Sequence, residues 1–310
     1  MAERKLGCAT LLALTIIPPA SAAPPAAHTE DPCVVRRVHE EVTGLRKRPW
    51  LGGELEAVEN DGRQMRVAHL LAKGPLAAAG VKVNDVILSV AGAELPTMPL
   101  TSTGASAGDG LPGSQHGVPV VLRLRRDGAE QELQVVPSRL PDTALPYALG
   151  LKVLRDQGWF RDGEVTSELL SVAADDCLAQ DARDRLLKLR QQAWLGIDHL
   201  RSLEQEEGTE LHVLKLNPEG PLAAAGVLEG DLILAIDRID FSTMLYRRAR
   251  VAIRQVLDGV QPGRPLHLRL RRGDSELEVE TTPPVLRGYP LAKRMGARLL
   301  SAAKIYFYED

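Results

Sequence analysis

The sequence has few aromatic residues and little net charge of either sign. Phe, Trp and Tyr together make up 4% of the 310 residues, and the formal net charge at pH 7 is −3. Proteins that bind nucleic acid commonly use aromatic stacking platforms or a strongly basic surface. The composition therefore argues against a nucleic-acid-binding protein. With 44% hydrophobic and 25% charged residues, it is typical of a soluble globular protein with about two domains.

Long apolar runs are missing from most of the chain. The first residues contain one, where Arg4 and Lys5 precede an apolar run at positions 6–17 that is followed by Ala20-Ser21-Ala22. This order is typical of a secretory signal peptide and predicts cleavage after Ala22. A buried or membrane-anchoring helix is the alternative, but a membrane span needs about 20 apolar residues. We therefore expect an exported protein, periplasmic or secreted, without a membrane span.

Two segments of the chain are near copies of each other. Residues 74–80 and 220–226 share the sequence GPLAAAG, and residues 50–52 and 194–196 both read WLG. Trp194 follows Trp50 by 144 residues, and Gly220 follows Gly74 by 146. Matching motifs in the same order, at a nearly constant spacing, indicate an internal duplication.

Each copy has the local patterns of a small domain that mixes short strands with helices. The GPLAAAG segment predicts a short helix with Pro in its first turn and Gly after its end. Later in each copy Leu and Arg alternate, at 122–125 and at 268–271, which places leucines on one face of a strand and arginines on the other. Turn residues at 127–128 and 273–274 lead into another alternating strand, so each copy ends in a predicted hairpin.

On these motifs the copies resemble the PDZ domains of the HtrA and tail-specific protease families, over residues 48–138 and 192–283. The resemblance implies that an extended peptide adds as a strand to an exposed sheet edge. The peptide's C-terminal carboxylate then meets backbone N–H groups of a loop with an apolar-Gly-apolar motif. In the second copy this motif is Leu195-Gly196-Ile197, preceded by Trp194. In the first copy it is Leu51-Gly52-Gly53, where glycine replaces the apolar third residue.

A helix that lines the peptide groove is expected only in the second copy. Residues 244–258 carry an apolar stripe at helical spacing that includes Ile253. The corresponding residues 101–117 of the first copy are rich in Gly, Ser and Thr, which predicts that the first groove has lost one wall. The helix of the second copy is made basic by Arg247, Arg248, Arg250 and Arg254. If they line the mouth of the groove, they would favour acidic residues in a bound peptide. A solvated helix face is the alternative interpretation of these arginines.

The arginines of the alternating strands also have two interpretations. A solvated sheet face is the simpler one, and an anion site is the alternative. The residues concerned are Arg123, Arg125, Arg126, Arg269, Arg271 and Arg272.

Catalytic and metal-binding motifs have better non-catalytic explanations. Residues 104–108 match the G-x-S-x-G pattern, but that nucleophile needs a sharp strand-to-helix turn and here stands among Gly, Ser and Pro residues. Ser301 and Lys304 match S-x-x-K on the expected surface of a tail helix. No H-E-x-x-H motif occurs. We therefore expect no enzyme activity, no metal and no cofactor.

Helical patterns precede each copy, at about residues 30–47 and 163–192. Cys33 and Cys177 each precede the tryptophan of their copy by 17 residues, so the duplication includes a leader helix. If the leader helices pack about a pseudo-twofold axis, these cysteines could form a disulfide in an oxidising compartment. Two buried thiols, or a bridge between two molecules, are the alternatives.

The predicted fold class is therefore α+β. It has two PDZ-like modules, each a partly open β-barrel or sandwich preceded by a leader helix, and a C-terminal helix that packs on a module. The expected order is a signal peptide (1–22), a leader helix (23–47), a first module with a degenerate groove (48–138), a helical linker (139–191), a second module (192–283) and a helical tail (284–310).

This organisation predicts a non-catalytic exported scaffold or adaptor. It would bind peptide C-termini or extended segments, mainly through the second module, and its partners would be proteins or peptides rather than nucleic acid. One alternative is a regulatory or substrate-delivery partner of a separate envelope protease. The other is a serine hydrolase, which the motifs above disfavour.

Overall fold

The structure is a computed structural model of the chain and describes residues 31–58, 61–94, 114–160, 172, 175–204 and 208–305. The predicted signal peptide and the G-x-S-x-G match at 104–108 lie outside the described residues. So do positions 101–113 of the segment 101–117, where the sequence predicts that the first groove lacks a helix. Among the helices that are described, none has the length and apolar character that a membrane crossing requires.

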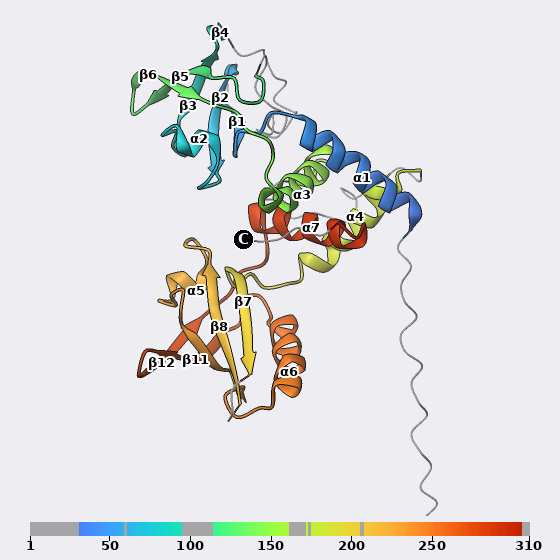
Figure 1. Cartoon of the computed structure of the whole chain (residues 1–310), viewed down its shortest axis with the longest axis vertical. Helices are drawn as coiled ribbons and strands as arrows, with labels where there is room; N and C mark the ends of the chain where they lie inside the picture. The colour runs from blue at the N-terminus through green and yellow to red at the C-terminus, as the bar shows by residue number, and fades with distance from the viewer. Residues whose placement is uncertain are drawn as a thin grey trace, which may run out of the picture.

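The chain folds into two sheet modules at opposite ends of a group of helices (Figure 1). In module 1 the strands pair in the order β1-β2-β3-β5-β6, with β4 beside β3, and in module 2 in the order β7-β8-β9-β11-β12, with β10 beside β9. All strand pairs are antiparallel and neither sheet closes into a barrel, so the α+β fold class is confirmed.

The bounds of the elements follow the duplication. Module 1 contains β1 (Gly53–Val58), β2 (Asp61–Leu70), α2 (Pro75–Ala78), β3 (Val86–Val90), β4 (Ala93–Glu94), β5 (Val120–Arg126) and β6 (Ala129–Val135). Module 2 contains β7 (Ile197–Glu204), β8 (Thr209–Leu216), α5 (Pro221–Ala224), β9 (Leu232–Ile236), β10 (Ile239–Asp240), α6 (Tyr246–Gly259), β11 (Leu266–Arg272) and β12 (Ser275–Thr281).

The strands form where the sequence alternates. In β5, Leu122 and Leu124 are fully buried while the arginines between and after them face outward. The hairpin to β6 turns at Asp127 and Gly128, which both have positive φ, 50° and 82°. Two central residues with positive φ match the twist of the flanking strands, and this is why Asp-Gly is favoured at such a turn.

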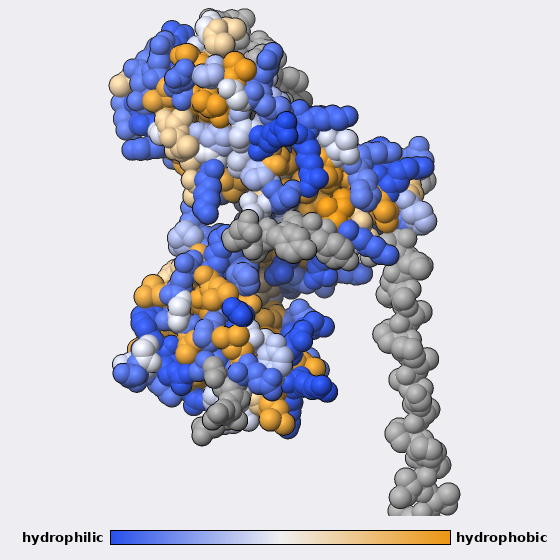
Figure 2. Space-filling view, in the orientation of Figure 1, coloured by the Kyte–Doolittle hydropathy of each residue, from blue (hydrophilic) through white to orange (hydrophobic). Residues whose placement is uncertain are grey.

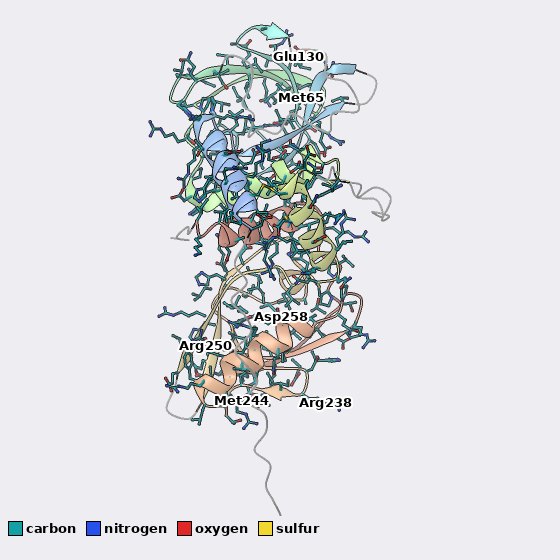
Figure 3. All side chains as sticks on the ribbon, turned by 90° about the vertical axis from the view of Figure 1, so that its right-hand side faces the viewer. Met65, Glu130, Arg238, Met244, Arg250 and Asp258 are labelled. Carbon is teal, nitrogen blue, oxygen red and sulfur yellow. A yellow bond between two sulfur atoms is a disulfide. The ribbon has the colours of Figure 1, made fainter. Side chains whose placement is uncertain are left out.

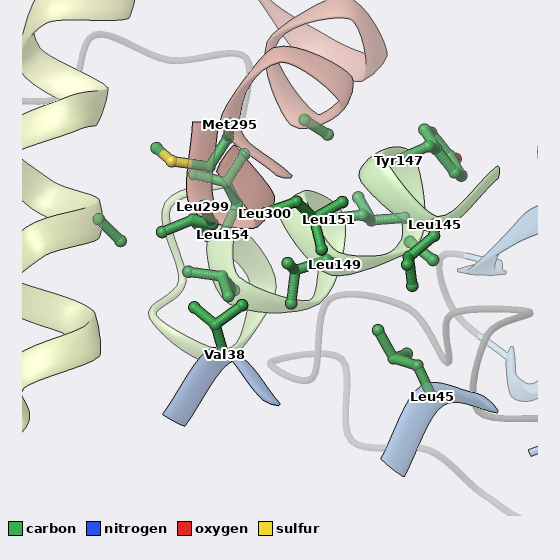
Figure 4. Close-up of a cluster of buried hydrophobic side chains, with 14 of the residues drawn as sticks. Val38, Leu45, Leu145, Tyr147, Leu149, Leu151, Leu154, Met295, Leu299 and Leu300 are labelled. Carbon is green, nitrogen blue, oxygen red and sulfur yellow. The ribbon is translucent and has the colours of Figure 1, made fainter. Parts of the chain in front are cut away.

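Four helices form a central hub with its own hydrophobic core. They are α1 (Pro32–Lys47), α3 (Leu145–Asp156), α4 (Cys177–Leu189) and α7 (Gly288–Ala302), and a short 3-10 turn at Asp142–Ala144 precedes α3. In α1 the Asp31 carboxylate accepts a hydrogen bond from the Cys33 N–H at 2.8 Å, which caps the first turn. The core side chains come from all four helices (Figure 4). The tail helix was expected to pack on a module; instead α7 packs on α3 and α4.

Helices α3 and α7 cross with their backbones in close contact. A Cβ atom added at Gly150 would lie 1.8 Å from the carbonyl oxygen of Ala292, and one added at Gly296 would lie 1.7 Å from that of Pro146. Gly296 follows Gly150 by 146 residues, and Ala292 follows Pro146 by the same number. The contact is therefore reciprocal, and the duplicated unit includes a trailing helix as well as a leader helix.

A disulfide joins the leader helices. Cys33 lies in the first turn of α1 and Cys177 begins α4, and their Cα atoms are 6.3 Å apart. Of the three arrangements open to the two cysteines, the structure contains the intramolecular bridge. It connects equivalent positions of the two copies, 144 residues apart in the chain.

The close helix crossing predicts the effect of adding one methyl group. Gly150→Ala should lower the free energy of unfolding by roughly 3 kcal/mol, the upper end of usual overpacking costs, because the clash is with backbone that cannot move aside. Gly44→Ala in α1 has open space within 4 Å and should instead raise it by about 0.5–1 kcal/mol. Chemical denaturation measures both, and equal stability of the two variants would contradict the crossing.

The disulfide predicts a dependence of stability on redox state. Reduction, or the double variant Cys33→Ala/Cys177→Ala, should lower the free energy of unfolding by about 2–4 kcal/mol, since the bridge constrains the unfolded chain over a long loop. Denaturation with and without reductant provides the measurement. Titration of thiols in the denatured, unreduced protein checks the bridge itself. Free thiols at both Cys33 and Cys177 would rule out the bridge.

Candidate functional site

Module 2 has a free sheet edge beside a helix. Strand β7 is the outermost strand of its sheet, and α6 lies next to it (Figure 1). Ala249 and Ile253 anchor α6 in the module core, with 0% and 8% of their surface exposed. On the surface, apolar residues gather over β7 and β8, while hydrophilic residues dominate the outer side of α6 (Figure 2).

The predicted Leu195-Gly196-Ile197 loop stands at the hub end of this edge. Gly196 has a φ of +78°, and a Cβ atom there would lie 2.6 Å from the Cα of Gly220, so only glycine fits. The Gly196 carbonyl accepts a hydrogen bond from the Asn217 N–H at 2.7 Å, and the Leu195 carbonyl accepts one from Leu222 at 3.4 Å. Within the described residues the N–H groups of Leu195 and Gly196 have no acceptor.

Module 1 repeats the loop but not its apolar third residue. Gly52 has a φ of +74° and faces Gly74 in the same way. The Leu51 carbonyl accepts from Leu76 at 2.9 Å. A Cβ at Gly53, however, would lie 2.9 Å from a methyl carbon of Leu76 and 3.0 Å from the His69 carbonyl oxygen. The neighbours of Gly53 occupy the space that the Ile197 side chain would need.

An acidic residue fixes each loop to the hub, and this was missed from the sequence. Asp198 follows Ile197 and forms an ion pair with Lys293 of α7, 2.9 Å from Nζ to Oδ1. Glu54 follows Gly53 and forms an ion pair with Arg155 of α3 at 2.5 Å, where both side chains are almost fully buried. The signal was an acidic residue directly after the motif in both copies.

Aromatic side chains surround the buried pair of module 1. The His69 ring stacks on Tyr289 of α7, with 4.0 Å between ring centroids, and Tyr147 of α3 lies beside both. Burial raises the pKa of the Tyr147 hydroxyl, and the nearby Glu54 carboxylate raises it further. Burial also lowers the pKa of His69. Module 1 is thus joined to the hub by a desolvated polar cluster at its loop.

Two strand arginines pair with buried aspartates. Arg126 donates two hydrogen bonds to the buried Asp85, at 2.7 and 2.6 Å, and Arg272 donates two to the buried Asp231, at 2.7 and 2.8 Å. The same aspartates accept from the N–H groups of the turn before β3 or β9. Both arginines remain in contact with solvent, and each also holds a turn of its module in place. The other four strand arginines pair with surface carboxylates.

The predicted wall residues Arg250 and Arg254 lie on the exposed side of α6. The Arg250 guanidinium stands over the Tyr246 ring, 5.7 Å from its centroid. Trp194 is half-buried and packs against the hub core, so it positions the loop rather than lining the groove.

The catalytic candidates that are described show no catalytic arrangement. Ser301 and Lys304 stand at the exposed end of α7, and the Ser301 carbonyl accepts a hydrogen bond from the Lys304 N–H. In the part of the chain that the structure describes, no three His, Cys, Asp or Glu side chains are placed to hold a metal ion.

Comparison with known proteins relates the chain to periplasmic proteases of the DegP type. The chain is 26% identical over 205 residues to a probable periplasmic serine endoprotease DegP-like of Pseudomonas putida strain F1, a match that covers 61% of this chain and 34% of the relative. The DegP-like protein of strain W619 is 27% identical over 205 residues. The chain spans about a third of the length of these curated relatives. No family model matches.

Comparison with solved structures also found matches to PDZ proteins. A crystal structure of the HtrA3 PDZ domain bound to a phage-derived ligand is 21% identical and covers 32% of this chain and 90% of that one, with a TM-score of 0.25. A PDZ domain protein from Parabacteroides distasonis is 9% identical and covers 76% of this chain and 97% of that one, with a TM-score of 0.26. Over the matched residues the chain is similar in sequence to these DegP-like proteins.

The buried Asp231 predicts a pH dependence of stability. Burial raises the pKa of Asp231, but hydrogen bonds from Arg272 and the Leu228 N–H lower it by more, so the pKa lies below the usual value. A lowered pKa adds stability above the unfolded pKa of about 4, and this is lost as pH falls through the folded pKa. The stability gap between the wild type and Asp231→Asn should therefore shrink below about pH 4 in acid titrations monitored by circular dichroism. Asp274→Asn, in an exposed turn, should show no such gap at neutral pH.

Proposed function

We propose that this protein is a non-catalytic exported adaptor that binds the C-terminal tails or extended segments of other proteins. The ligand adds as a strand to β7 of module 2, and its terminal carboxylate meets the N–H groups of Leu195 and Gly196. The observation that carries the proposal is the free edge of β7 beside α6, with two unused N–H donors at its hub end. Strand addition to an exposed edge uses such a surface.

The energetics of this mode point to moderate affinity. Each backbone hydrogen bond contributes about 0.5–1.5 kcal/mol net, in a way that tolerates many ligand sequences. Burial of one apolar terminal side chain beside Leu195 and Ile197 adds about 1.5–3 kcal/mol and gives selectivity. After the cost of ordering a flexible peptide, dissociation constants on the order of micromolar are expected.

Module 1 is proposed to bind such peptides weakly or not at all. Its third motif residue is Gly53, and the surrounding Leu76 and His69 leave no space for an apolar side chain there. The first module would therefore serve mainly as a rigid part of the scaffold, fixed to the hub through Glu54 and Arg155.

A partnership with a separate envelope protease is the second candidate. The similarity to DegP-like periplasmic endoproteases favours this candidate. About a third of the length of such a protease matches this chain, so the two kinds of protein share a segment. In this version the adaptor delivers or regulates substrates of the protease. Co-purification of a protease with the tagged protein from envelope extract distinguishes it from a free-standing adaptor, and labelling with a serine-hydrolase probe tests for activity of the chain itself.

The proposal predicts binding that depends on Ile197. The full-length mature protein should bind a peptide with a free apolar C-terminus in calorimetry, and Ile197→Asp should weaken this binding about 10- to 100-fold by removing apolar burial. Leu214→Asp replaces an equally apolar residue that is 42% exposed on β8, and it should leave binding unchanged. Full binding by the Ile197 variant would mean that the site lies elsewhere.

A further inference from the structure

Helix α6, which lies beside β7, carries arginines that form no ion pair within the described residues. These are Arg250 and Arg254, whereas the strand arginines of the same module are paired. The Arg250 guanidinium stands over the Tyr246 ring. Unpaired guanidinium groups beside a peptide groove are ready partners for acidic groups of a ligand.

Helix α7 places further cations at the end of the groove where a peptide carboxylate would lie. Lys293 contacts Asp198 directly after the Leu195-Gly196-Ile197 loop. Arg294 is exposed on the same helix, one residue after Lys293. Helix α7 therefore brings cations to this loop, although it belongs to the hub and not to the module.

The arginines of α6 extend the cationic border along the groove. Arg250, Arg254 and Asp258 are spaced four residues apart, so they form one row on the helix surface. Figure 3 shows Asp258 at the hub end of α6, Arg250 toward the other end and Met244 beyond it. A peptide that runs antiparallel to β7 with its terminus at Ile197 would pass Arg254 and then Arg250 on its way from the hub.

Among the described residues, the row contains one acid, Asp258 at its hub end, and the other charges near the groove are of both signs. On β7, Asp198 is neutralised by Lys293 and Arg201 is an additional exposed cation. The acidic Glu204 stands at the end of β7 far from the hub. Cations that share one helix surface repel one another, and an acidic ligand would relieve that repulsion.

We propose that the ligand of module 2 is an acidic C-terminal tail with an apolar last residue. Its terminal carboxylate lies nearest to Arg294 of the hub, and acidic side chains upstream lie along Arg254 and Arg250. This inference rests on the proposed function and adds to it the chemical class of the ligand and a binding residue from outside the module.

The test compares three peptides that share an apolar C-terminus and differ in the residues before it. The acidic peptide carries aspartate and glutamate there, the neutral peptide carries serine and glutamine, and the third carries lysine. With the full-length mature protein in calorimetry at low salt, the acidic peptide should bind about tenfold more tightly than the neutral one, and the lysine peptide most weakly. Salt on the order of 1 M should remove the difference, because exposed charge pairs are screened.

Charge reversal then locates the effect. Arg250→Glu/Arg254→Glu should reverse the order, so that the lysine peptide binds best. Arg264→Glu is the control. Arg264 is exposed, forms no ion pair within the described residues and precedes β11, on the other side of the sheet from β7. This variant should leave the order of the three peptide affinities unchanged. Arg294→Gln should narrow the preference for a free C-terminal carboxylate over a C-terminal amide. Thermal melts confirm that each variant is folded.

The outcomes separate the two proposals. Equal binding of acidic and neutral peptides by the wild type, or an unchanged order in the double variant, overturns the acidic ligand and leaves the peptide-binding function intact. Binding of none of the peptides overturns both. Binding to vesicles with anionic lipid, without a preference among the peptides, would assign the arginines to a membrane surface and also overturn the inference.

Discussion

The crossing of α3 and α7 is the contact on which the rest of the structure depends. Gly150 faces the Ala292 carbonyl and Gly296 faces the Pro146 carbonyl, so the two backbones touch in a reciprocal arrangement. No residue with a Cβ atom fits at either glycine. Because each helix trails one copy of the duplicated unit, their crossing holds the two copies together, much as two subunits meet at a twofold axis. The disulfide between Cys33 and Cys177 adds a covalent link between the leader helices of the same hub.

The hub also determines how the two loops are supported. Helix α7, which makes the crossing, supplies Lys293 to Asp198, and the exposed Arg294 follows it in the same helix. Helix α3 supplies Arg155 to Glu54 in the first module. A buried pair of that kind is costly to desolvate, and removal of one partner would leave an uncompensated charge. The glycine loop of each module is therefore supported by a helix outside its sheet.

The copies share a backbone plan but differ in the chemistry of their grooves. Gly52 and Gly196 have nearly the same positive φ and face equivalent glycines, and Asp85 and Asp231 hold equivalent turns through Arg126 and Arg272. Within the described residues the two glycine loops differ in their third motif residue. Glycine at position 53 fits against Leu76 and His69, whereas Ile197 has space for its side chain. Structural contacts were thus kept in both copies while the proposed binding surface was kept in one.

The sequence by itself determined the repeat, the α+β class, the alternating strands, the helix beside the second groove and the position of the glycine loops, because these depend on local periodicity and on residues with special backbone freedom. Only the tertiary structure decided which of three arrangements the cysteines adopt, that α7 packs on α3 rather than on a module, and that Glu54 meets Arg155. Residues about a hundred positions apart become neighbours only when the hub packs, and no local pattern records that distance. The pairing of Arg126 with Asp85 and of Arg272 with Asp231 was not predicted for the same reason, since each aspartate lies in the turn before another strand.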